Sequence, residues 1–307
     1  MTLIPIMSYI QKRGAVSRVS AAVSADGLTY TITFSTDISS SAGDPHDGIT
    51  IKDGASTLTI ASSVISGANL IITLDVTTAA SYIGKNNGSP TDEYNSAAAD
   101  SDIQGSNNME LESYSATAAT NNSKMLIVDT FTASNRPIDT HTALELNDAG
   151  GAYVELSGAY NIQTNAVENN TPAGNNVVHK ETDEADVVIT MDGLIGTAGQ
   201  SVGINARVVD DDNAWVLNLE DGNQRIAIYE LTTASGFTLK ASTGMTVTDS
   251  VTYSIEFTLS GTSLTGKVDG ANDVTFTSSV HQAATKHAMK TATATTSTMD
   301  NLVVEAV

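Results

Sequence analysis

The chain has 307 residues, of which 40% are hydrophobic and only 5% aromatic. Its 35 Asp and Glu residues against 14 Lys and Arg give a formal net charge of −21, which disfavours nucleic acid and anionic membrane surfaces as partners. We find no apolar run long enough for membrane insertion, and a chain without cysteine needs no disulfide. The length suits two domains of ordinary size.

Residues 1–13 are interpreted as a retained N-terminal arm. Lys12 and Arg13 follow its apolar part, which is the reverse of the charge order in a secretory signal. One alternative is a disordered tail. The other is an assembly arm that docks on a neighbouring subunit, which would account for the apolar side chains of Leu3, Ile4, Ile6, Met7 and Ile10.

Residues 14–123 are predicted to form a β-sandwich, because alternating apolar segments recur at intervals of roughly 10–15 residues. Residues 84–100 are rich in Gly, Asn and Ala, and we expect a loop there. The predicted strands cover residues 18–23, 28–35, 48–53, 58–65 and 70–76.

This part of the chain resembles the bacterial immunoglobulin-like domains that are repeated in surface adhesins. The resemblance rests on SADGLTYTITFSTDI, GITIKDG and SSVISGANLIITLDV, which begin at Ser24, Gly48 and Ser62. Residues 101–123 match the polar segment and closing strand of that family. The resemblance covers about a third of the chain and implies an Ig-like sandwich.

Residues 124–307 form the second predicted domain, and its centre lies between Gly203 and Leu231. Three alternating apolar runs are separated there by polar loops at residues 210–213 and 220–223, a pattern typical of antiparallel strands. Trp215 lies in the middle run, where it is a core anchor or, alternatively, a platform for sugar stacking. Residues 167–179 are expected to be a polar loop. Further strands are predicted at residues 125–131, 152–157, 160–164, 185–192, 237–241, 251–259, 263–268, 273–278 and 299–306.

The second domain resembles concanavalin A-like jelly rolls of the laminin-G type, which occur in phage virion proteins and in secreted glycan-binding and glycan-cleaving proteins. Six landmarks carry the resemblance in the expected order, although the chain is poor in aromatic residues. They are Asp129 and Phe131; Gly158, Tyr160 and Ile162; Ala185 to Val188; Arg207, Asp210, Asn213 and Trp215; Val268 to Gly270; and Asp300 to Leu302.

The acidic pairs do not indicate an enzyme. Glu181 and Asp183, like Asp210 and Asp212, have a spacing that places two carboxylates on one side of a strand, as glycoside hydrolysis needs. Aromatic subsites flank neither pair, and solvated turns account for both. The sequence also lacks a Gly-x-Ser-x-Gly elbow and a phosphate-binding glycine loop. We therefore predict that the chain is not an enzyme and that it needs no cofactor.

Two sites are predicted at the rim of the second domain. The loop residues Asp210, Asp212 and Asn213, together with Trp215, are the candidates for weak glycan contact. Asp210, Asp211 and Asp212 concentrate oxygen ligands and could hold Ca²⁺, although an ordinary acidic turn is the preferred explanation. First and last strands usually pair in this fold, so we also expect Asp129 and Asp300 to lie close together.

These observations predict an all-β protein with an Ig-like sandwich followed by a jelly roll. Together with the arm, the resemblances imply a structural virion protein of a phage, as a capsid decoration, head fibre or tail-associated fibre. It would assemble with sister subunits and capsid or tail proteins at the virion surface, with possible contact to a host glycan. The alternative is a carbohydrate-binding adhesin or lectin module at the bacterial surface. A glycan-cleaving enzyme is the third and weakest hypothesis.

Overall fold

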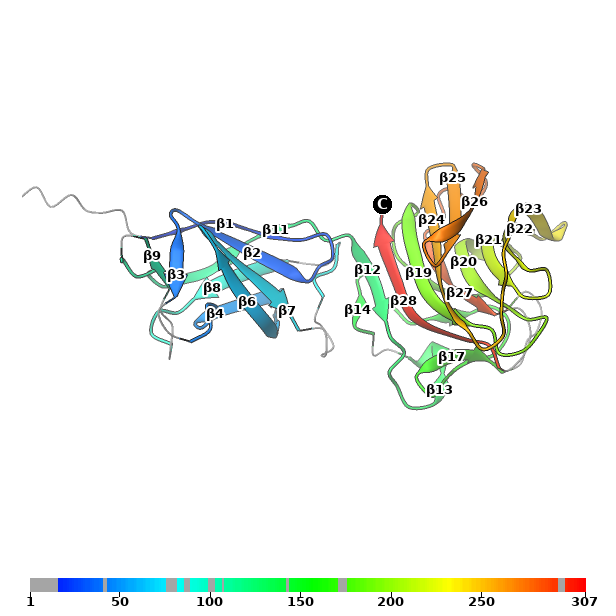
Figure 1. Ribbon diagram of the computed structural model, residues 1–307, viewed down its shortest axis with the longest axis horizontal. Helices are drawn as coiled ribbons and strands as arrows, with labels where there is room; N and C mark the ends of the chain where they lie inside the picture. The colour runs from blue at the N-terminus through cyan, green and yellow to red at the C-terminus, as the bar shows by residue number, and fades with distance from the viewer. Residues whose placement is uncertain are drawn as a thin grey trace, which may run out of the picture. The chain divides into compact units, whose positions relative to one another are not determined.

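In the computed structural model, almost all regular structure is β-strand (Figure 1). The helical element among the described residues is a single 3₁₀ turn, η1 (Ile138–Thr140), and no described helix could cross a membrane. The predicted all-β class is therefore confirmed. The structure describes residues 16–40, 43–75, 82–85, 89–98, 103–106, 108–141, 144–170, 176–291 and 296–307.

The chain divides into two compact units. Unit 1 contains residues 1–24, 28–75 and 89–122, and unit 2 contains residues 25–27, 76–88 and 123–307. Two short segments of the predicted first domain thus belong to unit 2. The five apolar side chains of the assembly arm, Leu3, Ile4, Ile6, Met7 and Ile10, lie outside the described residues.

Unit 1 is built from two main sheets and one strand pair. The five-stranded sheet has the order β11-β1-β2-β7-β6, and the four-stranded sheet has the order β10-β8-β4-β5. The first comprises β1 (Arg18–Val23), β2 (Thr29–Phe34), β6 (Ile60–Ser66), β7 (Asn69–Leu74) and β11 (Thr120–Asn121). The second comprises β4 (Ile49–Asp53), β5 (Ser56–Thr57), β8 (Pro90–Tyr94) and β10 (Tyr114–Ala118), and β3 (Ile38–Ser40) pairs with β9 (Ile103–Gly105).

Alternation along these strands explains the core of unit 1. Tyr30 and Ile32 of β2, Ile51 of β4 and Leu70 and Ile72 of β7 are fully buried, whereas their neighbours along each strand are more exposed. The immunoglobulin-like assignment of this sandwich stays a prediction.

Strand β8 corrects the sequence analysis, which placed a loop over residues 84–100. It pairs with β4 and β10 and is therefore an inner strand of its sheet. Pro and acidic residues are rare in strands, so the sequence PTDEY did not predict a strand. Its inward side chains are Pro90, Asp92 and Tyr94, so a buried carboxylate lies in the interior of unit 1.

Unit 2 is a β-sandwich of a ten-stranded and a seven-stranded sheet. The larger sheet comprises β12 (Met125–Asp129), β13 (Arg136–Pro137), β14 (Leu146–Asn147), β16 (Tyr160–Gln163), β17 (Ala166–Asn169), β19 (Val187–Leu194), β24 (Thr252–Ser260), β25 (Ser263–Val268), β26 (Ala271–Thr277) and β28 (Thr298–Ala306). The smaller has the order β15 (Val154–Glu155), β18 (Val178–Glu181), β27 (Lys286–Thr291), β20 (Ser201–Asp210), β21 (Asn213–Glu220), β22 (Arg225–Thr232) and β23 (Gly236–Gly244).

The three central runs predicted from the sequence are β20, β21 and β22, which pair in succession. The first strand of the unit, β12, pairs with the last, β28, with Asp129 opposite Leu302, as the sequence analysis expected. The polar loop predicted at residues 167–179 is wrong in part, because β17 and β18 take residues from both of its ends. Strand β27, which the sequence analysis did not identify, lies beside β20 in the middle of the smaller sheet.

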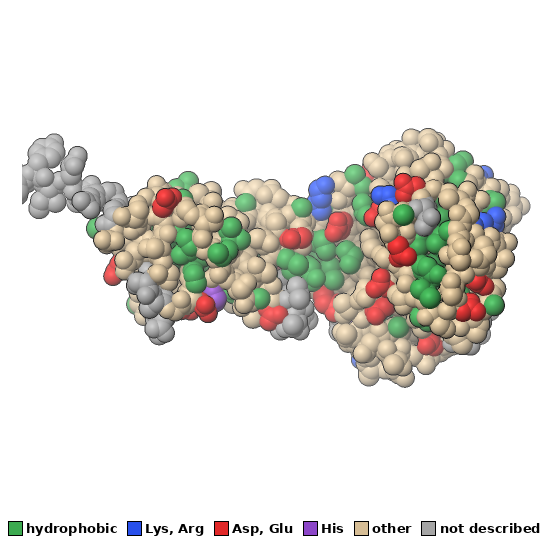
Figure 2. Space-filling view, in the orientation of Figure 1, with side chains coloured by type: hydrophobic (Ala, Val, Ile, Leu, Met, Phe, Trp, Pro, Cys, Tyr) green, Lys and Arg blue, Asp and Glu red, His purple; other side chains and the backbone are tan. Residues whose placement is uncertain are grey.

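The core of unit 2 lies between its two sheets. The inward side chains of β20 to β22 belong to one large buried cluster with those of β19, β24 and β28. Arg207 ties the layers together, because its side chain leaves β20 at a bulge and donates hydrogen bonds to Ala185 O, Asp186 Oδ1 and Gly261 O at 2.8–3.1 Å. The space-filling view of one face is mostly neutral and polar, with scattered acidic and few basic side chains (Figure 2).

Candidate functional site

Trp215 is a core residue and offers no platform for a ligand. Its side chain is fully buried, its ring centroid lies 5.7 Å from that of Phe276, and its indole Nε1 donates to Val280 O at 2.8 Å. A sugar can stack only on an exposed ring face, so the proposed role of Trp215 in glycan contact is wrong, and the alternative of a core anchor describes its position.

The turn at residues 210–213 uses its acids to stabilise itself. Asp210 Oδ1 accepts hydrogen bonds from Asp212 N at 2.9 Å and from Asn213 Nδ2 at 2.7 Å. In the described part of the chain, no group of three or more His, Cys, Asp or Glu side chains has the geometry to hold a metal ion. The structure thus gives no support to the calcium site predicted at Asp210, Asp211 and Asp212. That site and the glycan role of Asp210, Asp212 and Asn213 stay predictions.

Glu181 and Asp183 lie where β18 ends. Glu181 Oε1 accepts from the backbone N–H groups of Thr182 and Asp183, both at 3.2 Å, so this carboxylate caps the turn that follows the strand. Burial favours the neutral acid, but these bonds and one from the Thr285 side chain lower the pKa of Glu181 below its usual value. A general acid would need the opposite shift.

The outer face of the smaller sheet carries a cluster that the sequence analysis did not identify. Since Leu217, Leu219, Ile226 and Ile228 face the core, the alternate residues of β21 and β22 face outward. The cluster, which we call the outer-face cluster, consists of Asn218, Glu220, Arg225, Tyr229, Phe237 and Lys290 from β21, β22, β23 and β27.

The centre of the outer-face cluster is an ion pair bound to a phenol. Glu220 Oε2 accepts from Arg225 Nε and from Asn223 Nδ2, each at 2.8 Å, while Glu220 Oε1 accepts from Tyr229 OH at 2.6 Å. Arg225 Nη2 in turn donates to Tyr229 OH at 2.7 Å. Glu220 and Arg225 directly oppose each other in the β21–β22 ladder, so the hairpin fixes their geometry.

This network sets the charge states of its members. Burial alone would raise the pKa of Glu220, but hydrogen bonds from Tyr229, Arg225 and Asn223 lower it below its usual value. Burial, and then the neighbouring Glu220 carboxylate, raise the pKa of Tyr229 to about 12. The phenol therefore stays a donor and the carboxylate stays ionised throughout the physiological range.

Two aromatic rings and a lysine show that the outer face is concave. The rings of Tyr229 and Phe237 meet edge to face at 6.2 Å, and Lys290 Nζ lies 4.7 Å from the centroid of Phe237. Lys290 and Phe237 are on β27 and β23, and four strand spacings of about 4.8 Å would hold their Cα atoms roughly 19 Å apart on a flat sheet, farther than the two side chains together can bridge. The sheet therefore curves around the cluster.

Lys290 and Asn218 have unused hydrogen-bonding capacity. Lys290 is 3% exposed, and among the described residues its ammonium contacts the Phe237 ring without a hydrogen bond or ion pair. The buried Oδ1 of Asn218 has no partner either, and it lies above Gly203, which has no side chain to fill the gap between the two. Burial lowers the pKa of Lys290 to about 8, and Glu220 opposes this shift.

The outer-face cluster thus combines an exposed aromatic edge with polar groups of both kinds. Phe237 is 39% exposed, Arg225 and Tyr229 are half-buried, and Lys290 and Asn218 are buried. Such a surface can bind a molecule with an apolar face and many hydroxyl groups.

Comparisons with known proteins give similarity to solved structures alone. No protein-family model matches the chain, and no curated protein matches it. A carbohydrate-binding module, CBM66 of Bacillus subtilis, is similar at 10% identity and a TM-score of 0.41 over 50% of this chain and 95% of that one. The galectin LEC-6 of Caenorhabditis elegans is similar at 14% identity and a TM-score of 0.35, over 45% of this chain and 93% of that one.

A third similar structure is a putative glycosyl hydrolase of Parabacteroides distasonis, at 10% identity and a TM-score of 0.37 over 58% of this chain and 90% of that one. At these identities and TM-scores, none of the three transfers a ligand or a reaction to this chain. The function has to be argued from the residues of the chain itself.

Proposed function

We propose that this chain is a non-catalytic carbohydrate-binding protein and that unit 2 binds the sugar on the concave outer face of its seven-stranded sheet. The observation that carries the proposal is the exposed Phe237 ring beside the Glu220–Arg225 pair on this curved face. This proposal corresponds to the alternative of the sequence analysis, with a different set of residues.

Four members of the outer-face cluster have a role in the proposed complex. A sugar ring has an apolar C–H face, which packs on the exposed part of the Phe237 ring and on Tyr229. Arg225 uses Nε and Nη2 within the protein, so its remaining N–H groups donate to ligand hydroxyls. Lys290 Nζ packs 4.7 Å from the centroid of Phe237 and helps to hold the ring in place.

A glycan array followed by calorimetric titration tests the proposal. Phe237→Ala removes the exposed ring and Arg225→Met removes the donors, and we expect each to weaken binding of the best ligand by about tenfold or more, which is roughly 1.4 kcal/mol. Val251→Ala is the matched control, because Val251 is equally exposed at 40% and lies outside the cluster. Unchanged binding by both cluster variants, or an equal loss in the control, contradicts the proposal.

The absence of catalysis is the second part of the proposal. It is supported by the position of Glu181, which caps a turn, and by the lowered pKa of Glu220, which disfavours a general acid. We expect no release of reducing ends when the purified chain is incubated with bacterial and algal glycans. Release that Glu181→Gln, Asp183→Asn or Glu220→Gln abolishes would contradict this part.

The virion role predicted from the sequence concerns a different level of organisation. Its localisation and its capsid or tail partners depend on the N-terminal arm, whose residues lie outside the described part of the chain. A protein displayed on a particle can also bind glycans, so the virion role stays a prediction that is compatible with the proposed function.

A further inference from the structure

Unit 1 contains a groove at an open edge of its sandwich. The groove has a volume of about 400 Å³ and runs between the start of β1 and the segment that leads into β10. It is lined by Val16, Ser17, Arg18, Val19, Leu111, Glu112, Ser113, Tyr114 and Thr117, and we call it the β1–β10 groove.

Both strands beside the groove have open edges. Strand β1 pairs with β2 on one side, but on its other side it pairs only with β11, at Ala22 and Val23. Strand β10 is the terminal strand of its sheet and pairs with β8 on one side. Among the strands that the structure describes, none lies between Arg18–Ala21 and β10. Open strand edges of this kind bind extended polypeptide by main-chain hydrogen bonding.

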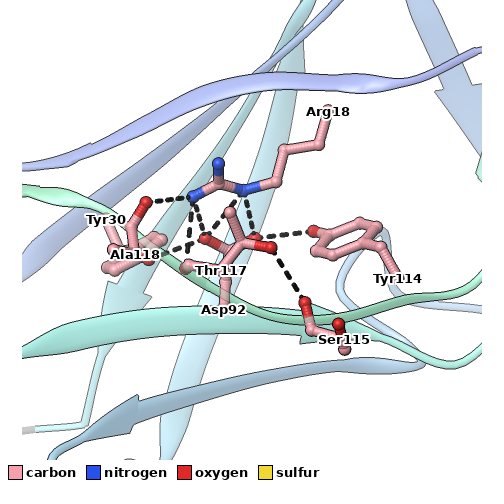
Figure 3. Close-up of polar contacts among 7 residues, drawn as sticks. All are labelled: Arg18, Tyr30, Asp92, Tyr114, Ser115, Thr117 and Ala118. Atoms are coloured by element: carbon pink, nitrogen blue, oxygen red, sulfur yellow. Dashed lines mark hydrogen bonds and ion pairs between the residues drawn. The ribbon is translucent and has the colours of Figure 1, made fainter.

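The floor of the groove is held rigidly by a buried ion pair (Figure 3). Arg18 binds the Asp92 carboxylate through Nε and Nη2 at 2.6–3.0 Å, and Nη2 also donates to Ala118 O at 3.0 Å. Tyr30 OH and Tyr114 OH donate to the same carboxylate at 2.8 and 2.7 Å. Four strands are therefore joined behind the groove, and a ligand strand would meet a preformed surface.

The walls of the groove combine apolar side chains with an acid. Val16 and Leu111 are almost fully buried at its base, whereas Val19 is 62% exposed beside it and Glu112 is exposed. A segment that covers Val19 and neutralises Glu112 would need apolar residues followed or preceded by basic ones.

The chain itself contains such a segment. Residues 3–10 include five large apolar side chains, and Lys12 and Arg13 follow them in a chain of net charge −21. These residues lead into Val16, which lines the groove. Extended, the ten residues 3–12 span roughly 33 Å, which is longer than any strand of unit 1.

We propose that residues 3–13 of one copy of this chain bind as an added strand in the β1–β10 groove of a second copy. A second copy is the favoured acceptor because an added strand must lie beside β1. An arm of the same chain could lie there only if the backbone reversed its direction within residues 14–15, next to Val16. Two copies that exchange arms in this way form a closed, two-fold dimer. The groove thus gives the assembly arm a defined partner.

Two measurements test the proposal: the mass of the chain in solution and the binding of a peptide that corresponds to the arm. Light scattering with size-exclusion chromatography is applied to the full chain and to a chain lacking residues 2–13. A labelled peptide of residues 2–13 is then titrated onto the shortened chain. We expect a dimeric full chain, a monomeric shortened chain with unchanged circular dichroism, and saturable binding of the peptide.

Two valine variants localise the contact. Val19→Lys places a cation beside the groove, and we expect it to weaken peptide binding by about tenfold or more and to dissociate the full-length dimer. Val64→Lys is the matched control, since Val64 is 56% exposed on β6, at the edge of the five-stranded sheet, and should change neither. If the peptide does not bind, if both variants act alike, or if the full chain is a monomer although the peptide binds, the proposal is overturned. The last result would mean that the arm fills the groove of its own subunit.

Discussion

Each unit holds a carboxylate between an arginine and tyrosine hydroxyls, yet the two arrangements differ in burial. In unit 1, Asp92 is bound by Arg18 and two phenols, and the two charged side chains are 0% and 8% exposed. In unit 2, Glu220 is bound by Arg225 and one phenol, and these side chains are 11% and 24% exposed beside the exposed ring of Phe237. The same hydrogen-bonded ion pair stabilises the fold where it is fully buried, in unit 1. Where one side of it is open to solvent, in unit 2, it is a candidate ligand site.

The largest loss of stability is expected when the charge of the buried Asp92 is removed. Asp92→Asn leaves the buried Arg18 without its anion, and breaking such a pair costs about 3–5 kcal/mol of unfolding free energy. Glu220→Gln, the corresponding change in unit 2, should cost only about 1 kcal/mol because the pair is partly solvated. Urea unfolding followed by circular dichroism measures both. Equal losses would show that the two networks do not differ as their burial suggests.

Lowering the pH should destabilise unit 2 before unit 1. His287 Nδ1 accepts from Arg207 N while its Nε2 faces Glu184 O, and burial lowers the pKa of His287 to about 4 from an ordinary value of 6.5. The unfolded chain therefore binds more protons between these values, so stability falls as pH drops from 6.5 towards 4, by up to about 3 kcal/mol. His179, whose pKa burial also lowers to about 4, adds to the effect. Asp300, whose pKa burial raises to about 6, offsets part of it, because its folded state binds the extra proton.

The measurement is thermal unfolding at a series of pH values, with native-state hydrogen exchange to assign the loss. We expect protection in unit 2 to decrease first, since both histidines lie there. A His287→Gln chain should show a shallower pH dependence. Simultaneous loss in both units, or an unchanged slope in the variant, would contradict the assignment.

Removal of one hydroxyl from each network gives a smaller contrast. Tyr114→Phe removes a donor to the buried Asp92, and we expect a loss of about 1–3 kcal/mol of stability. In Tyr229→Phe, water can replace the lost donor at Glu220, so the loss should stay below about 1 kcal/mol. Chemical denaturation of the two variants in parallel measures both losses. A larger loss for Tyr229→Phe than for Tyr114→Phe would contradict the distinction between the buried and the open network.

The smallest change in stability is expected at Lys290, a buried cation without a carboxylate partner among the described residues. Arg18 has a carboxylate partner, whereas Lys290 is buried against Phe237 without one among the described residues. Lys290→Met keeps much of the volume and removes the buried charge, so we expect stability at pH 7 to rise by about 1 kcal/mol while glycan affinity falls. A destabilised variant with unchanged affinity would show that the ammonium serves the fold and not a ligand.

The sequence predicted the parts of the fold that depend on local alternation. Strands β20 to β22 and the burial of Trp215 follow from a period of two in apolar residues. Strand β8 was missed because Pro90 and Asp92 are poor strand formers, and the partners of Asp92, from Arg18 to Tyr114, are dispersed along the chain.

The outer-face cluster was not identified from the sequence for a related reason. The acidic turn at residues 210–213 was chosen because its oxygens are adjacent in sequence, whereas the outer-face cluster gathers side chains from four strands. Glu220 and Arg225 could have been found as outward positions flanking one hairpin turn. Lys290 could not, because it lies on β27, and only the curvature of the sheet brings it to Phe237.

The central claim is that the open network binds carbohydrate while the sealed one does not. Amide chemical shifts of the full, isotope-labelled chain, followed during titration with the best glycan from the array, test it directly. We predict saturable shifts at Arg225, Tyr229 and Phe237 and none at Tyr30 or Asp92. Shifts confined to unit 1, or a bound glycan that leaves β21 to β23 unperturbed, would contradict the account.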